Sequence, residues 1–565
     1  MTLERSRMRW NGWGWRDHPD PLAGRAAVWP WIAEALGVAA LPDTPARPLE
    51  DIVLPPSRLD DKTLAALRAI LGDERVRVDK RERAFHARGR SYHDLLHLRA
   101  GRLEAAPDAV LYPSSEDEVI ATLALAAGEG IAVIPFGGGT SVVGGVTAEP
   151  GPGQGAVITL DTTAMNKLLG IDRQAMTARF EAGIDGPALE GALASAGLTL
   201  GHYPQSFEFS TLGGWIAARG AGQQSYRYGK AEKWLAGLRL ATAAGVLTTH
   251  DFPASAAGPD LNQLVLGSEG IFGVITEATV KLHTAPAVKD YRGYLLKDFA
   301  AGLEAVRALC QADLPIAMAR LSDADETHYF RAFAEIGHAG GAGRRLKAGL
   351  ARAVLRLRRF SGHPCLLLIG AEGDAATTAY AGRHAARLVR AHGGLALGRS
   401  PGARWHEGRF AGPYSRDPML DRGLGVDTLE TATRWSNIAP LYAGVREALL
   451  QAMRETAASP GARGIVLGHV SHAYRDGASL YFTFLFPRDR EDAIGQWRHI
   501  KAAASSAIIA HGGTISHHHG VGTDHAAWLA AEKGEVGLAA LRAVKAGIDP
   551  QAILNPGKLL AAPPE

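Results

Sequence analysis

The segment that most constrains the fold is a glycine-rich loop at the end of an apolar run. The run IAVIPF (131–136) predicts a buried strand, and GGGTSVVGG (137–145) follows it without a break. Glycines let backbone N–H groups approach and cradle a pyrophosphate, and the hydroxyls of Thr140 and Ser141 can add donors. A tight turn without a ligand explains the loop equally well when it is taken alone.

Two common nucleotide-binding motifs do not fit this loop. A GxGxxG fingerprint needs glycine at position 142, where the chain has Val142. A P-loop needs Lys followed by Ser or Thr after the glycines, and no Lys follows them. The spacing therefore argues against a Rossmann-type NAD site and against P-loop chemistry.

Short helices and strands alternate around the loop. Ser115 and the acidic residues after it predict a capped helix over residues 116–130. Strands are expected at residues 155–160 and 176–184, and a hairpin is expected to turn near Gly245. The mixture continues to about residue 510 and predicts an α+β fold.

Size, charge and cysteine content limit the number of domains, the partners and the compartment that can be expected. A chain of 565 residues is expected to form two or three domains, and a net charge of +3 gives no case for a nucleic-acid partner. Two cysteines, Cys310 and Cys365, cannot make a disulfide framework, which favours a reducing compartment. No signal-peptide core or membrane-spanning run is present, so a cytoplasmic or peripheral membrane location is expected.

Three consecutive histidines, His517, His518 and His519, lie in the string HGGTISHHHGVGT. They are about fifty residues from the end of the chain, between an apolar helix-like run and a glycine-paired turn, so they are not a terminal tag. The simplest explanation is a catalytic cluster. Structural packing and adventitious metal binding are the alternatives.

Three later segments carry a resemblance. QSFEFSTLGGWIAARGAG (205–222), GSEGIFGVIT (267–276) and LNPGK (554–558) follow the glycine loop in an order that resembles the vanillyl-alcohol oxidase, or PCMH-type, flavoenzymes. The resemblance implies an FAD-binding domain with an α+β cap domain. The residues that it assigns to FAD are Pro135, Phe136, Gly137, Gly138, Gly139, Thr140, Ser141, Gln205, Ser206, Phe207, Glu208, Phe209, Ser210, Thr211, Ala218, Arg219, Gly220, Ala221, Glu269, Gly270, Ile271, Phe272, Gly273, Val274 and Ile275.

Within these flavoenzymes the chain resembles the alkylglycerone-phosphate synthases, also called alkyl-dihydroxyacetone-phosphate synthases. RWNGWGWRD (9–17), ARLSD (319–323) and SHHHGVG (516–522) carry this resemblance together with the flavin segments. It implies exchange of the acyl group of acyl-dihydroxyacetone phosphate for a fatty alcohol, through a flavin N5 adduct, in ether lipid biosynthesis. It also implies a lipid-like substrate, a homodimer and noncovalent FAD, with His202 the first residue to check for covalent attachment.

The resemblance also assigns roles to single residues. It makes Tyr474 the proton-transfer residue, Arg416 and Arg320 substrate-binding residues, and the three histidines a catalytic cluster. Each has a structural alternative: a core tyrosine for Tyr474, an ion pair with Asp417 or Asp421 for Arg416, and an ion pair with Asp323 for Arg320.

Some positions depart from the synthase pattern, and other functions compete with it. LETATRWSN (429–437) keeps only part of a family run, and Thr523 stands where a Lys is usual. The chief rival is an FAD-linked 2-hydroxyacid dehydrogenase of the D-lactate or glycolate type. Its metal motif is broken here, because His469 is present but Tyr481 replaces the later histidine, so no metal is expected. An aryl-alcohol oxidase and a non-catalytic flavin-binding module are weaker alternatives.

The expected organisation has four parts. Residues 1–50 form an N-terminal arm rather than core, 51–285 the FAD-binding domain with its core at about 105–285, 286–510 the cap, and 511–565 a segment that returns to the FAD domain. Residues 343–360 are basic and amphipathic, which predicts either a membrane-surface helix or a solvated cap helix.

Overall fold

The computed structural model describes residues 4–101, 103–336 and 362–560, together with Leu355, Leu357 and Phe360. The predicted basic helix over 343–360 lies outside the described residues apart from those three positions. None of the described helices is long and apolar enough to cross a bilayer.

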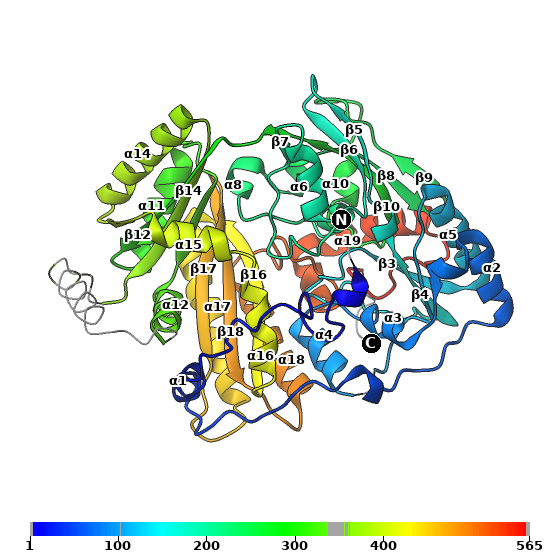
Figure 1. The fold of residues 1–565 in the computed structure, drawn as a ribbon, viewed down its shortest axis with the longest axis horizontal. Helices are drawn as coiled ribbons and strands as arrows, with labels where there is room; N and C mark the ends of the chain where they lie inside the picture. The colour runs from blue at the N-terminus through cyan, green and yellow to red at the C-terminus, as the bar shows by residue number, and fades with distance from the viewer. Residues whose placement is uncertain are drawn as a thin grey trace.

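Two sheets form the first half of the molecule, on the right of Figure 1. The smaller has the order β1-β2-β4-β3, with parallel pairing of β2 and β3 to β4. The larger has the order β5-β6-β10-β8-β9 and is antiparallel. Their strands are β1 (Val76–Arg77), β2 (Ala109–Leu111), β3 (Ile131–Phe136), β4 (Ala156–Asp161), β5 (Leu168–Asp172), β6 (Thr177–Glu181), β8 (Leu235–Thr242), β9 (Gly245–Thr248) and β10 (Val274–Lys281), and β7 (Leu198–Thr199) pairs separately with β11 (His283–Thr284).

Local sequence explains several of these elements. The Ser115 hydroxyl accepts a hydrogen bond from the Glu118 N–H, which caps the predicted helix. The strand before the glycine loop is buried, and the hairpin turns just before Gly245, so these predictions are confirmed. The helices of this half are α2 (Asp61–Leu71), α3 (Lys80–Phe85), α4 (Tyr92–Arg99), α5 (Glu116–Glu129), α6 (Gly186–Ala194), α7 (Leu212–Ala217), α8 (Ser225–Tyr228), α9 (Ala231–Trp234) and α10 (Asn262–Val265).

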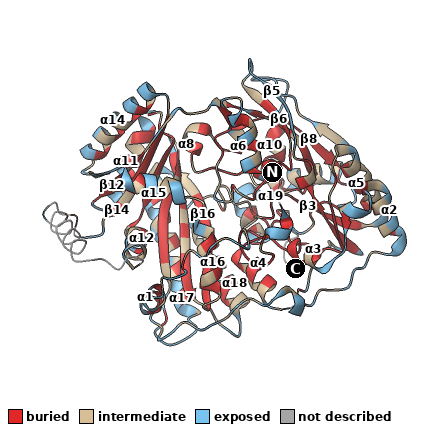
Figure 2. Ribbon diagram, in the orientation of Figure 1, coloured by how far each residue is buried: buried red, intermediate tan, exposed pale blue. Residues whose placement is uncertain are grey.

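A seven-stranded antiparallel sheet forms the second half, on the left of Figure 1, in the order β15-β12-β14-β13-β17-β18-β16. Helices α11 and α14 pack on its β12–β14 end, and α17 packs on β17 and β18. Most strand residues are buried, as the red strands of Figure 2 show. The strands are β12 (Val288–Leu296), β13 (Met318–Ser322), β14 (Cys365–Gly373), β15 (Leu395–Gly398), β16 (Leu424–Arg434), β17 (Ile465–Ala473) and β18 (Gly477–Pro487). The helices are α11 (Phe299–Gln311), α12 (Ala324–Ile336), α14 (Ala375–Ala391), α15 (Ser400–Gly408), α16 (Arg416–Leu420), α17 (Ile438–Glu455) and α18 (Ala493–Ala510). The last helix, α19 (Leu529–Ile548), packs in the apolar core of the first half.

Side chains of the N-terminal segment are buried in the core. The prediction that residues 1–50 form an arm rather than core is therefore wrong about how this segment packs. Met8, Trp10 and Trp13 belong to the apolar cluster that also fills the seven-stranded sheet. The segment runs across the molecule to α1 (Val28–Ala35) and back to α2, as the dark blue ribbon of Figure 1 shows. Indole rings bury large apolar areas, which makes this short segment a structural strap.

The end of the chain returns to the glycine loop. Leu554 bridges to Val133 of β3, in parallel. The Asn555 side chain donates to the carbonyls of Gly145 and Glu269 at 3.0 and 2.6 Å. Segments that are hundreds of residues apart in sequence therefore meet at one place.

Candidate functional site

The glycine loop packs directly on the segment at 209–211. A Cβ atom on Gly138 would lie 2.1 Å from the Phe209 carbonyl oxygen, and one on Gly137 would lie 2.2 Å from the Thr211 hydroxyl. Gly270 approaches Pro135 in the same way, at 3.0 Å. These close approaches require glycine and bring the three predicted flavin segments together.

The loop has the chemistry of an anion cradle. The backbone N–H groups of residues 138–142 donate no hydrogen bond within the described part of the chain. The carbonyls of Gly137 and Gly138 instead accept from the guanidinium of Arg5, which also pairs with Asp161. A row of unused N–H groups fits the pyrophosphate of FAD.

Other predicted flavin residues face inward or are tied to the same junction. Ile271, Phe272, Val274 and Ile275 are buried in apolar clusters, so only their backbone can face a cofactor. The segment at 216–221 is joined to the Glu-Gly segment, because the N–H groups of 267 and 269 donate to the carbonyls of 216 and 217.

A few predicted flavin residues have other partners. The Gln205 amide donates to the Arg409 carbonyl at 2.7 Å, and Arg219 donates to Gln263 at 2.9 Å. Phe207 stacks on Phe410, with ring centroids 5.3 Å apart. The structure therefore does not bring the side chains of Gln205 and Arg219 to the glycine loop.

A buried carboxylate, Glu430 of β16, holds the histidine run. It accepts hydrogen bonds from the backbone N–H groups of His517, His518 and His519 at 2.8, 2.9 and 2.9 Å, and from the Ser516 hydroxyl at 2.8 Å. Burial alone would raise the pKa of Glu430. The hydrogen bond of His518 and the positive charge that His518, His519 and His517 carry when protonated together outweigh burial and hold this pKa well below its ordinary value. A permanent negative charge thus lies beneath the three imidazoles.

Tyr474 and two of the histidines form a hydrogen-bonded chain. The Tyr474 hydroxyl is 2.6 Å from Nε2 of His517, and Nδ1 of His517 is 3.0 Å from Nδ1 of His518. Nδ1 of His518 is 3.4 Å from a Glu430 oxygen. Burial, followed by the nearby Lys230 ammonium, keeps the pKa of His517 well below its usual value, and burial raises the pKa of Tyr474. In the resting site both groups are therefore neutral.

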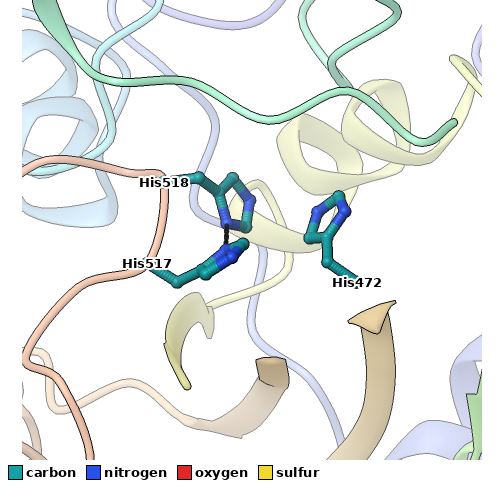
Figure 3. A group of neighbouring side chains, drawn as sticks. All are labelled: His472, His517 and His518. Atoms are coloured by element: carbon teal, nitrogen blue, oxygen red, sulfur yellow. Dashed lines mark hydrogen bonds between the residues drawn. The ribbon is translucent and has the colours of Figure 1, made fainter. Parts of the chain in front are cut away.

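A fourth histidine, His472, joins the run. It lies near the end of β17, where the pairing with β18 shifts register between Val470 and Ala473. A regular strand would point residues 469 and 472 to opposite faces, and the register shift changes this alternation. The His472 ring lies 5.2 and 5.0 Å from the rings of His517 and His518. Figure 3 shows the three imidazoles side by side.

Arg416 lies at the start of α16 with one edge of its guanidinium unpaired. Its Nε and Nη2 atoms are buried and have no hydrogen-bond partner in the described part of the chain. The alternative ion pairs are not formed, because Asp417 bonds the Arg9 side chain and the Trp13 N–H, and Asp421 pairs with Arg99. Nε and Nη2 form the edge that binds two oxygens of a phosphate or carboxylate. Burial lowers the pKa of this uncompensated cation, so an anion bound there would stabilise it.

Arg320 has protein partners instead. Its guanidinium contacts the Ser322 hydroxyl and Glu326 at 2.9 Å each, and Nδ1 of His469 at 3.1 Å. The structural alternative for Arg320 was an ion pair with Asp323, but Arg320 pairs with Glu326 instead. His469 in turn stacks on Tyr481, whose ring lies 5.3 Å from that of His519. The positions of the rival dehydrogenase motif are thus occupied by an ion-pair and stacking network.

The other end of the histidine loop is held by Glu269. This buried carboxylate accepts from the N–H groups of Val521 and Gly522. Burial raises the pKa of Glu269 to about 7, although the two N–H donors oppose the rise. The histidine loop is therefore held at one end by Glu430 of the seven-stranded sheet and at the other end by Glu269 of a flavin segment.

Sequence reasoning did not place Glu430 or His472 in the site. Glu430 was visible as a carboxylate in the strand-like run LGVDTLETA, and His472 as a second histidine in GHVSHAY. A charge in a buried strand requires partners, and that is the signal which could have pointed to Glu430. No sequence signal reports the register shift that orients His472.

Two family models match the chain: "FAD binding domain" over residues 107–250 and "FAD linked oxidases, C-terminal domain" over 285–559. An alkyldihydroxyacetonephosphate synthase of Trypanosoma brucei brucei is 33% identical over 94% of this chain and 86% of the relative. A solved alkyldihydroxyacetonephosphate synthase superposes with a TM-score of 0.81 at 29% identity, covering 98% of this chain and 100% of the other. The structure of p-cresol methylhydroxylase, at 14% identity and a TM-score of 0.62 over 89% and 96% of the chains, shares the fold, so the predicted PCMH-type architecture is confirmed.

Proposed function

Since the chain belongs to the alkyldihydroxyacetonephosphate synthase family of FAD-dependent enzymes, we propose that it exchanges the acyl group of acyl-dihydroxyacetone phosphate for a fatty alcohol. The observation that carries the proposal is the Tyr474–His517–His518 chain, which ends beside the Glu430 carboxylate. FAD bound at the glycine loop would supply an electrophilic ring that accepts the substrate carbon.

The substrate carbon next to the carbonyl must lose a proton, and the hydrogen-bonded chain can take it. In the starting arrangement the Tyr474 hydroxyl donates to Nε2 of His517, and Nδ1–H of His517 donates to Nδ1 of His518. Each proton moves one place as the substrate proton enters at the Tyr474 oxygen. Tyr474 and His517 end neutral, and His518 becomes an imidazolium 3.4 Å from the Glu430 carboxylate. Glu430 thus stabilises the charge that the transfer creates.

Arg416 is proposed to bind the phosphate of the substrate. Its unpaired Nε–Nη2 edge matches two phosphate oxygens, and no carboxylate within the described residues lies close enough to form an ion pair with it. Arg320 is proposed to position the site, because it holds His469 against Tyr481.

FAD is proposed to be held without a covalent bond. His202 is fully buried between Trp215 and Trp234, and its Nδ1 accepts from the Trp234 indole N–H at 3.2 Å. A ring fixed in this way supports a structural role for His202. Acid precipitation tests it, since noncovalent FAD stays in the supernatant and covalently bound flavin sediments with the protein.

The reaction is tested by incubating the FAD-loaded protein with palmitoyl-dihydroxyacetone phosphate and labelled hexadecanol. The expected result is label in a product that survives alkaline ester hydrolysis, together with one released fatty acid per product. D-lactate with an electron acceptor is the parallel assay. Acceptor reduction without labelled ether would overturn the proposal in favour of the dehydrogenase.

The proposal includes a homodimer, by family relationship, and contact of residues 343–360 with an anionic membrane. Light scattering after size-exclusion chromatography tests the first. Flotation with anionic liposomes tests the second, and binding that survives Arg-to-Glu changes at positions 352, 356 and 358 would contradict it.

A further inference from the structure

His472, His517 and His518 converge in a way that the proposed reaction does not require. One ring nitrogen of each lies within 4.8 Å of the others, as Figure 3 shows. Two of these nitrogens, Nδ1 of His517 and Nδ1 of His518, are only 3.0 Å apart. The histidine run supplies two of the imidazoles. The third, His472, comes from β17, at the point where its register with β18 shifts.

The third imidazole is available for binding. His472 is 6% exposed, and its Nδ1 atom is buried without a hydrogen-bond partner among the described residues. An imidazole nitrogen that makes no hydrogen bond can offer its lone pair to a ligand when it is not protonated. A buried imidazole nitrogen without a partner costs free energy that a ligand would recover.

We propose that His472, His517 and His518 form a binding site for a divalent ion of the Zn²⁺ type. Three imidazole ligands suit Zn²⁺ and similar transition metals, whereas Mg²⁺ and Ca²⁺ require oxygen ligands. Zn–N bonds of about 2.0–2.1 Å place tetrahedral ligand atoms roughly 3.3 Å apart, so His517 and His518 are already close to the required spacing. The His472 nitrogen lies within 4.8 Å of the other two, so it must approach by at most about 1.5 Å, and one coordination position is left for water or a substrate oxygen.

This site is distinct from the broken dehydrogenase motif. His469 of that motif is engaged with Arg320 and Glu326 and stacks on Tyr481. The proposed ligands come from other positions, and Glu430 lies behind them as a charge that favours a cation.

The consequence of occupancy is inhibition. An ion on Nδ1 of His517 and of His518 replaces the proton that the two rings share. That would interrupt the chain from Tyr474 to His518. Only this consequence rests on the proposed function; binding of the metal itself does not.

The direct test adds Co²⁺ to the FAD-loaded protein and follows d–d absorption at wavelengths beyond the flavin bands, with Zn²⁺ as competitor. One ion per chain is expected, and His472→Asn should weaken binding by at least about 100-fold. His517→Asn gives a second variant in case the first does not fold, with flavin absorbance as the check. The matched control is His97→Asn, because His97 and His93 form another histidine pair, with Nε2 atoms 3.0 Å apart, and neither is a proposed ligand.

The results separate the possible failures. Absent Co²⁺ bands, or equal affinity in both ligand variants and the wild type, would overturn the site. Synthase activity that falls with Zn²⁺ and returns with a chelator supports the inhibitory role, and full activity at one bound ion per chain overturns that role. If the protein lacked synthase activity altogether, the proposed function would fail while the Co²⁺ titration still decided the site.

Discussion

The two ends of the histidine loop are held by the same kind of group in opposite electrostatic states. Glu430 accepts three backbone N–H groups and a hydroxyl and lies beside the imidazoles, so its pKa stays well below normal. Glu269 accepts only two N–H groups, and burial raises its pKa to about 7. One carboxylate is a permanent charge at the proposed reacting groups, and the other is an anchor that can become neutral.

This difference indicates how the loop can serve two parts of the molecule. The Glu430 end faces Tyr474 and the Arg416 side of the seven-stranded sheet, where charge would change in the proposed reaction. The Glu269 end faces the glycine loop, where Asn555 also ties the chain end. We expect changes at the first end to reduce the rate and changes at the second to affect stability and cofactor retention.

The largest effect is expected from Tyr474→Phe. Removing the hydroxyl removes the entry point of the proton chain, so kcat should fall by about 10²- to 10⁴-fold while the flavin spectrum is unchanged. The labelled-hexadecanol assay measures it. Tyr442→Phe is the matched control, because that hydroxyl bonds Asp323 outside the chain. If Tyr474→Phe kept nearly wild-type activity, the proposal that proton transfer takes place at the Glu430 end of the loop would be wrong.

The next effect is expected from Glu430→Gln. A glutamine amide cannot accept all of the N–H groups and carries no charge to stabilise the His518 imidazolium. We expect kcat to fall by about 100-fold, since the imidazoles lose both charge compensation and position. Glu269→Gln is the paired variant. An equal loss of kcat in that variant would contradict the expectation that only the Glu430 end controls the rate.

Arg416→Lys should act mainly on substrate binding. A lysine ammonium cannot reproduce the two-point Nε–Nη2 contact, so kcat/KM should fall by about 10- to 100-fold, chiefly through KM. Arg99→Lys is the control, because Arg99 already has Asp421 as its partner. A loss confined to kcat, with KM unchanged, would show that Arg416 acts on the Glu430 chain rather than on phosphate.

The smallest effect concerns the pH dependence of stability at the Glu269 end. The pKa is raised from 4.5 to about 7 in the fold, so the contribution of Glu269 is fully present below pH 4.5 and is lost as the pH rises through 7. Between pH 5 and pH 8 the wild type should lose up to about 3 kcal/mol that Glu269→Gln does not lose. Thermal unfolding of both proteins across this range measures it. Parallel pH profiles of Tm would show that Glu269 is charged throughout.

The sequence predicted the parts of this site that depend on local backbone geometry and on contacts between residues close in the chain. Gly137 and Gly138 are needed because the loop touches residues 209–211, and Gly139 because it lies against the Phe136 ring at positive φ. A run of glycines after an apolar strand is visible without a structure. The same is true of the Ser115 cap, whose partner is only three residues away. Ordered motifs then identified the flavin family.

Tertiary structure decided what these residues do together. Glu430, Tyr481 and His469 lie side by side because three strands pair in one register, and a single shift in that register turns His472 to the histidine run. Whether Arg416 or Arg320 has a free edge depends on carboxylates that are distant in sequence, such as Glu326. The sequence determined by itself the fold family, and it predicted the flavin loop and the proposed reactive groups, because these follow from local backbone requirements and residue chemistry. The tertiary structure alone decided which groups are charged, paired or free, because burial and long-range pairing set those properties.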